Sequence, residues 1–143
     1  MMLRALALCA ALCACSPAPP VAKAPAEAAP AGFRLDNLAS GARLVSPAKI
    51  TGVAPNDWYF EAVFQAKLVG ADGKVIAEAP AQAQTDWTAP GPVPFAAAFT
   101  FDVPVDTPAT LMLAEDMYGS EDHPEATKVV NIPVTLAGAL RQQ

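Results

Sequence analysis

The stretch WYFEAVFQAKL, residues 58–68, decides the fold, because apolar positions recur at every second residue along it. One face of an extended chain would carry only apolar side chains: Trp58, Phe60, Ala62, Phe64, Ala66 and Leu68. The other face would carry a mixed set: Tyr59, Glu61, Val63, Gln65 and Lys67. A period of two is typical of a β-strand with one face in the core and the other in solvent. We therefore predict a half-buried strand over residues 58–68, with Tyr59 on its outer face.

The residues after this strand predict a hairpin. Asp72 and Gly73 suit a tight turn, because both residue types tolerate positive φ angles, and residues 74–78 then return as the partner strand. A second alternating stretch spans residues 95–103. Its predicted inner face carries Phe95, Ala97, Phe99, Phe101 and Val103. Two rows of the core are therefore visible in the sequence.

Short apolar stretches broken by Pro, Gly, Asn and Asp continue through residues 33–138. They predict four more strands, at residues 42–45, 48–53, 111–114 and 129–136. The fold class is therefore all-β, and seven short strands predict an immunoglobulin-like antiparallel β-sandwich. No cysteine follows Cys15, so Trp58 and the phenylalanines of the second alternating stretch must supply the bulk that a disulfide supplies elsewhere.

Pro133 lies inside the last predicted strand. Proline has no amide hydrogen to donate, so a sheet tolerates it only at an edge or a bulge. We therefore expect one side of the 129–136 strand to be open, at a place where a partner could add.

The amino end has the basic start, short apolar run and small residues of a secretion signal. Leu12-Cys13-Ala14-Cys15 resembles the bacterial lipoprotein signal, in which a cysteine after two small residues receives a diacylglyceryl group. Cys15 fits this pattern better than Cys13, which directly follows a leucine. We predict that residues 1–14 are a lipoprotein signal peptide and that Cys15 carries the diacylglyceryl and N-acyl lipid. The alternative is an ordinary secretory peptide.

Residues 15–32 are predicted to be the lipidated cysteine and a tether. Residues 16–32 hold five prolines, no aromatic residue and one charge of each sign, which is too little apolar surface to offset chain entropy. An extended proline-rich chain at about 3.1 Å per residue could hold the domain up to roughly 50 Å from a membrane. A proline motif for docking is the alternative to a plain spacer. Residues 139–143 form a short tail.

Charge and residue content argue against two classes of function. Nine Lys and Arg against fourteen Asp and Glu give a net charge of -5, which leaves no cationic surface for nucleic acid. A nucleophilic enzyme needs a base beside its nucleophile, and His123 is the one histidine of the sequence. We therefore predict no enzymatic activity, no catalytic residues and no cofactor apart from the covalent lipid.

Two groups of residues are candidate ligand contacts. Five carboxylates within eleven residues could hold calcium, although their spacing matches no EF-hand, and a solvated acidic loop is the alternative. These carboxylates are Glu115, Asp116, Glu121, Asp122 and Glu125. The aromatic residues that the predicted facing leaves exposed could stack on a sugar ring, although Trp87 could instead cap the core. With His123 they make up the candidate ligand or partner contacts: Tyr59, Trp87, Tyr118 and His123.

Nine short features occur in order between residues 46 and 136. They are Ser46-Pro47, Gly52 with Ala54, Trp58-Tyr59-Phe60-Glu61, Leu68 with Asp72-Gly73, Trp87, Pro94-Phe95, Phe99 with Phe101, Leu111 with Leu113, and Ile132-Pro133-Val134. In this order they resemble the immunoglobulin-like domain associated with bacterial spore germination, a family also found in envelope lipoproteins. The resemblance implies a seven-stranded sandwich in an exported protein, a role in binding or assembly, and no catalytic residues. Where the family often has a Ser-Gly pair, this chain has Gly119-Ser120.

These observations together predict a non-catalytic protein of the bacterial cell envelope. The lipid would anchor it to a membrane, and the domain would present loops or an edge strand to an envelope protein. The alternative function is a module that binds peptidoglycan or another glycan through the exposed aromatic residues and the acidic loop at residues 115–125. Ser16 after the lipidated cysteine favours the outer membrane, facing the periplasm, over the outer face of the cytoplasmic membrane.

Overall fold

Eight strands and one short 3-10 helix form the part of the chain that the computed structural model describes, which is residues 29–116, 122 and 128–139. In chain order these elements are β1 (Arg34–Leu35), β2 (Arg43–Leu44), β3 (Ala48–Pro55), η1 (Asn56–Trp58), β4 (Val63–Gly70), β5 (Val75–Ala83), β6 (Pro92–Phe99), β7 (Thr107–Ala114) and β8 (Val129–Leu136). The predicted all-β class is confirmed. Each of the seven predicted strands has a counterpart, and β1 is an additional strand of two residues. The signal, Cys15 and most of the tether lie outside the described residues.

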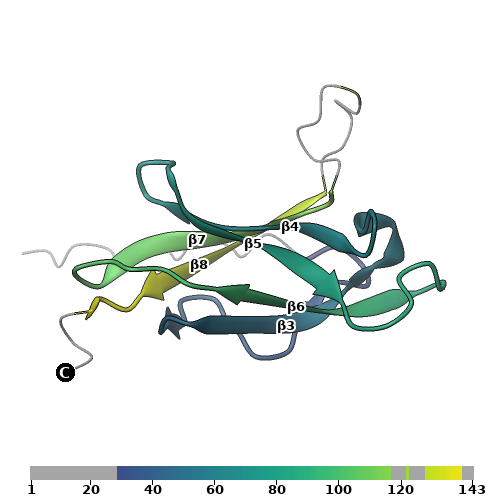
Figure 1. Cartoon of the computed structure of the whole chain (residues 1–143), viewed down its shortest axis with the longest axis horizontal. Helices are drawn as coiled ribbons and strands as arrows, with labels where there is room; N and C mark the ends of the chain where they lie inside the picture. Colours follow the sequence, from purple (N-terminus) through teal and green to yellow (C-terminus); the bar gives the residue numbers. More distant parts are fainter. Residues whose placement is uncertain (1–28, 117–121, 123–127, 140–143) are drawn as a thin grey trace, which may run out of the picture.

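Hydrogen bonds join the eight strands into one sheet in the order β1-β3-β6-β5-β4-β7-β8-β2. All neighbours are antiparallel except β2, which runs parallel to β8. β5 pairs with β4 along most of its length but with β6 only through Gln82 and Ala83. The sheet curls there, so that β3 and β6 lie across from β4, β7 and β8 (Figure 1). The structure therefore has one continuous curled sheet of eight strands where the sequence predicts a sandwich of seven.

Aromatic side chains join the two parts of the curled sheet. Phe64 of β4 and Phe95 of β6 are not on neighbouring strands, yet their ring centroids are 4.9 Å apart in an edge-to-face arrangement. Trp58 contacts Phe64 at 5.5 Å and Phe33 at 5.2 Å between ring centroids. Such pairs add stability beyond the area that they bury. These rings supply the bulk predicted for a core without a disulfide.

The predicted inner face is confirmed in full on the second alternating stretch and from Phe64 onward on the first. On β4 the buried side chains are Phe64, Ala66 and Leu68. From β6 onward they are Phe95, Ala97, Phe99, Phe101 and Val103, although the strand itself ends at Phe99. The hairpin turn is also confirmed: Gly73 has a φ of 82°, and the Gly70 N–H donates to the carbonyl of Lys74 at 2.8 Å.

The predicted strand over residues 58–68 begins five residues later than expected. Trp58 ends η1 with 1% of its surface exposed, but Phe60, which was predicted to point inward, is 53% exposed. Glu61 and Ala62 have φ angles of 49° and 68°. The backbone groups of Phe60 and Val63 exchange two hydrogen bonds, of 2.9 and 3.1 Å. This is a two-residue turn with type I′ geometry, and it interrupts the strand although the apolar alternation of the sequence continues through it.

Pro133 lies in β8 with its backbone turned away from β7. Its carbonyl accepts a hydrogen bond from the Gly41 N–H at 2.7 Å, and the Thr135 N–H donates to the Ala42 carbonyl at 2.9 Å. Odd-numbered residues of β8 therefore face β2, and the sheet needs no N–H from Pro133 to pair with β7. β2 covers only Thr135 and Leu136, so the predicted open edge is absent there but present along residues 129–132 among the described strands.

Candidate functional site

Tyr59 is buried, which corrects its prediction as an exposed ligand contact. Its side chain is 5% exposed, and its hydroxyl donates a hydrogen bond to the Val93 carbonyl at 2.8 Å. Burial raises the pKa of this hydroxyl above its usual range. The turn at residues 60–63 causes the difference, because it begins directly after Tyr59 and interrupts the strand. Tyr59 therefore contributes to the core and cannot stack on a sugar.

Trp87 is half-buried and packs against the core, which fits a cap better than an open platform. The other predicted contacts, Tyr118 and His123, lie outside the described residues, as do Glu121, Glu125 and the Gly119-Ser120 pair.

Glu115 is buried and paired with a lysine. Its carboxylate accepts a hydrogen bond from the Lys128 N–H at 3.2 Å and lies 3.7 Å from Lys128 Nζ. Lys128 also forms an ion pair with Asp57, and the hydrogen bond to Asp57 is the main reason why the pKa of Lys128 is raised. Within the described part of the chain, no three His, Cys, Asp or Glu side chains gather as metal ligands.

The carboxylate of Asp116 is partly shielded from solvent. Burial, and then the neighbouring carboxylate of Glu61, raise the pKa of Asp116. Its backbone holds it beside the turn, because the Asp116 N–H donates to the Trp58 carbonyl at 3.0 Å and its carbonyl accepts from Gln65 Nε2 at 2.8 Å. The turn that follows Phe60 therefore brings Glu61 close to the Asp116 carboxylate.

We call Phe60, Glu61 and Asp116 the anchor site. The Ala83 N–H donates to the Ala62 carbonyl at 2.8 Å, so β5 fixes the turn that carries Phe60. The sequence analysis missed this site because Phe60 falls on the same alternating positions as the buried residues of β4. The clue that could have revealed it is the acidic Glu61 in the middle of an otherwise apolar run.

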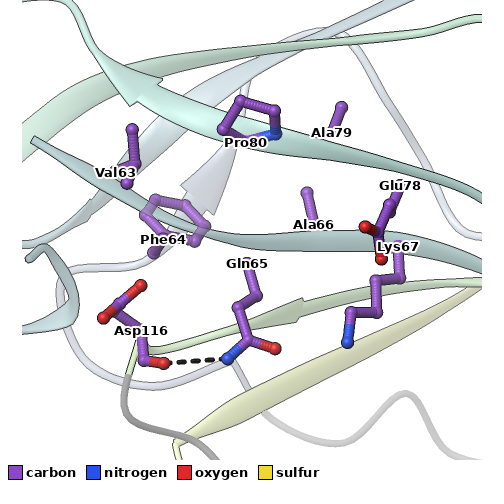
Figure 2. Close-up of a pocket in the computed structure, with 9 residues that line it drawn as sticks. All are labelled: Val63, Phe64, Gln65, Ala66, Lys67, Glu78, Ala79, Pro80 and Asp116. Atoms are coloured by element: carbon purple, nitrogen blue, oxygen red, sulfur yellow. Dashed lines mark hydrogen bonds between the residues drawn. The ribbon is translucent and has the colours of Figure 1, made fainter.

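A groove of about 520 Å³ runs along β4 and β5, and Asp116 is the one residue of the anchor site that lines it (Figure 2). Val63 and Asp116 line the end nearest the turn. Farther along, Lys67 and Glu78 lie directly opposite each other in the strand register. These lining residues include no serine, threonine or cysteine that could act as a nucleophile.

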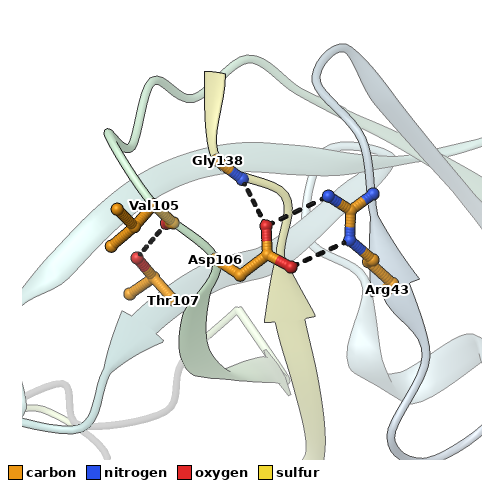
Figure 3. A network of polar contacts seen from close by, with 5 residues as sticks. All are labelled: Arg43, Val105, Asp106, Thr107 and Gly138. Carbon is orange, nitrogen blue, oxygen red and sulfur yellow. Dashed lines mark hydrogen bonds and ion pairs between the residues drawn. The ribbon is translucent and has the colours of Figure 1, made fainter. Parts of the chain in front are cut away.

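A second polar network joins β2 to the ends of β7 and β8 (Figure 3). The Asp106 carboxylate accepts hydrogen bonds from Arg43 Nη2 at 3.0 Å, from Arg43 Nε at 3.3 Å and from the Gly138 N–H at 3.0 Å. Gly138 must be glycine, because a Cβ atom there would lie 2.4 Å from the Val105 backbone. We call these three residues the clasp, and it holds β2 against the carboxyl end of β8.

Comparison with known proteins identifies one family. The model of the immunoglobulin-like domain of bacterial spore germination matches residues 38–119. No curated protein and no solved structure gives a significant match. Among the described residues, no helix is long and apolar enough to span a membrane.

Proposed function

We propose a function for this chain, which belongs to the family of immunoglobulin-like domains of bacterial spore germination. It is a non-catalytic interaction module of the cell envelope. Cys15 carries the lipid that anchors it, the residues up to 32 set its reach, and the domain contacts an envelope protein. The lipoprotein-like signal supports the anchor, and Ser16 supports the outer-membrane address facing the periplasm. The outer face of the cytoplasmic membrane is the alternative address.

The anchor site is the observation that carries this proposal. Aromatic side chains are enriched among the residues that dominate binding energy at protein interfaces. Phe60 is exposed, and the turn beside it places two non-glycine residues at positive φ, which costs about 1–3 kcal/mol each. A fixed turn lowers the entropy lost on binding, because the backbone that carries the side chain is already ordered.

The charges at the anchor site specify the partner. Glu61 directly follows Phe60 in the chain, and its carboxylate acts on that of Asp116. The ion pairs among the described residues include neither of these two carboxylates. Complementary charge at an interface speeds association and rejects wrong partners. The partner surface should therefore be an apolar pocket bordered by lysine or arginine.

The experiment is crosslinking in living cells, followed by mass spectrometry, with four forms of the full chain. Phe60→Ser removes the anchor, and Val105→Ser is the matched control, because Val105 is also an exposed apolar residue at 59%. Cys15→Ser removes the lipid while leaving export possible. We expect one protein to be enriched with the unaltered chain and with Val105→Ser, and to be lost with Phe60→Ser.

The same experiment separates the glycan alternative. If no protein depends on Phe60 and the chain instead sediments with purified cell-wall sacculi, the protein-binding proposal fails. Membrane fractionation tests the anchor separately, because a Cys15→Ser chain that stays membrane-bound would contradict lipidation at this residue.

A further inference from the structure

The two ends of the curled sheet face each other across a slot. The strand order begins with β1 and ends with β8 and the short β2. A slot of about 400 Å³ is lined by residues 33–35, at β1, and by residues 130–133 of β8. Leu38 and Ser40 of the segment after β1 and Ala29 before it complete the lining. We call this slot the seam. Because one slot contacts both ends of the sheet, the seam is the place where the sheet does not close.

Backbone groups on both sides of the seam point into it. Odd-numbered residues of β8 face away from β7, as Pro133 and Thr135 show, so the N–H and C=O groups of Asn131 face the seam. On β1, the Asp36 N–H donates to Thr51 of β3, so Leu35, one residue earlier, faces away from β3. β2 pairs with β8 only at residues 135–136, and no described strand pairs with Asn131 on this side.

The side chains of the seam are suited to an uncharged, apolar segment. Phe33 and Val130 are buried, and Leu35, Leu38 and Ile132 are half-buried against the core. Arg34 is the charged residue of the lining, and it is paired with Asp36 at 2.9 Å. An extended chain that lies in the seam would direct every second side chain onto this apolar floor.

The other incomplete edge of the sheet is less suited to accept a strand. β5 pairs with β6 only at Gln82 and Ala83, which leaves its earlier residues open on that side among the described strands. The Gln84 N–H donates to Pro94 of β6. Pro80 lies four residues earlier, so its backbone faces the same side of β5, but proline has no N–H to donate there. On β8, Pro133 lies outside the open stretch of residues 129–132, and Asn131 within that stretch has an N–H that can donate.

We propose that the seam binds an extended, apolar segment of a partner protein by strand addition, with hydrogen bonds to Asn131 of β8 on one side and Leu35 of β1 on the other. Addition of a strand to an open sheet edge is a general mode of peptide recognition, in which the main chain gives affinity and alternate side chains give specificity. One added strand would connect the two ends of the sheet. This surface is separate from the anchor site and does not depend on the function proposed for Phe60.

The test uses the mature full chain in detergent micelles and two synthetic probes. One probe is an acetylated peptide of alternating threonine and valine, and the other is the same peptide with N-methyl groups on alternate amides. Amide NMR spectra are expected to show that the first probe shifts the signals of Leu35 and Asn131 and slows their hydrogen exchange by about tenfold. The methylated probe is expected to bind at least about tenfold more weakly, because it cannot complete the ladder.

Two variants at one position make the test specific. Asn131→Pro removes the N–H that faces the seam and should weaken binding of the first probe by about tenfold, whereas Asn131→Thr keeps the N–H and should bind normally. Pro133 shows that β8 accepts proline in this orientation. If Asn131→Pro does not fold, the difference in binding between the two probes to the unaltered chain tests the proposal. Equal binding of both probes, or shifts confined to other amides, would overturn the proposal. Phe60→Ser should leave probe binding unchanged, so this result is independent of the anchor site.

Discussion

Phe60 and Phe99 are the same residue type, and their positions give them opposite roles. Phe99 is 1% exposed in the core, whereas Phe60 is mostly in solvent. Phe99→Ala is expected to lower the free energy of unfolding by about 3–5 kcal/mol, because it removes contacts and leaves a cavity. Phe60→Ala should change it by no more than about 0.5 kcal/mol. Urea unfolding of both variants measures the difference, and a near-neutral Phe99→Ala would contradict the core described above.

Asp116 should make stability depend on pH. Its pKa in the folded chain is raised above the ordinary value of 3.8, so its charged form is disfavoured by folding. This unfavourable contribution is present above the folded pKa and disappears as the pH falls below the unfolded value. Asp116→Asn is therefore expected to melt at a higher temperature than the unaltered chain at pH near 7.

The difference in melting temperature between Asp116→Asn and the unaltered chain should vanish at strongly acidic pH, where Asp116 is protonated in both states. Asp102→Asn, which removes one exposed charge elsewhere, is the control for the change in net charge. A stabilisation that persists unchanged in acid would mean that lost charge on Asp116 is not its cause.

Single residues also show how far the sequence could predict the structure. The inward facing of Phe64 and Phe99 followed from alternation, because a strand with one buried face leaves that pattern directly. Alternation could not predict the burial of Tyr59 or the exposure of Phe60, because it assumes that both residues belong to a strand, and β4 begins only at Val63. Trp87 was ambiguous in the sequence, and its half-buried place depends on contacts with distant residues.

At the scale of elements, the turn after Phe60 is the least expected feature. Type I′ turns prefer Asn-Gly or similar pairs, since both central residues need positive φ. Glu61-Ala62 carries none of that turn chemistry, so the acidic Glu61 was the one local sign of a break in the strand. The Asp72-Gly73 turn does carry it, and that hairpin was predicted correctly. β1 was missed because two residues are too few to show a period.

Ala62→Gly is expected to stabilise the protein. Alanine at a φ of 68° is strained, and glycine adopts this conformation without a steric penalty. The gain should be about 1 kcal/mol, since the relief exceeds the extra chain entropy of glycine. Ala66→Gly, within β4 and buried, is the matched control and should lower stability by at least about 0.5–1 kcal/mol. Thermal and urea unfolding measure both, and destabilisation by Ala62→Gly would contradict the turn geometry.

At the scale of the whole molecule, the clasp decides whether β2 stays on the sheet. Asp106→Ala removes the acceptor shared by Arg43 and Gly138. Hydrogen exchange should become faster at the amides of Thr135 and Ala137, which donate to the segment that includes β2, while the amides of β4 keep their protection. Asp102→Ala is the control. Uniform acceleration over the sheet would mean global destabilisation and would contradict a local role for the clasp.

The overall architecture was only partly readable in the sequence. The all-β class and seven of the eight strands follow from local patterns, but the joining of all strands into one sheet depends on β5 pairing with β4 and then with β6. The pairing of β5 with two neighbours is a property of the assembled chain, and the sequence of residues 75–83 does not reveal it. The seam and the clasp likewise bring together residues from opposite ends of the domain.

The parallel pairing of β2 with β8 has a mechanical consequence. β2 lies near the amino end of the domain and β8 near its carboxyl end. Because the two strands run in the same direction, tension between those ends pulls them past each other along their axes. The load then falls on the Ala42–Thr135 and Leu44–Ala137 hydrogen bonds and on the clasp at the same moment. A pull on the amino end of the domain would therefore load β2 in shear, after it has drawn on the buried ring of Phe33 and the two residues of β1.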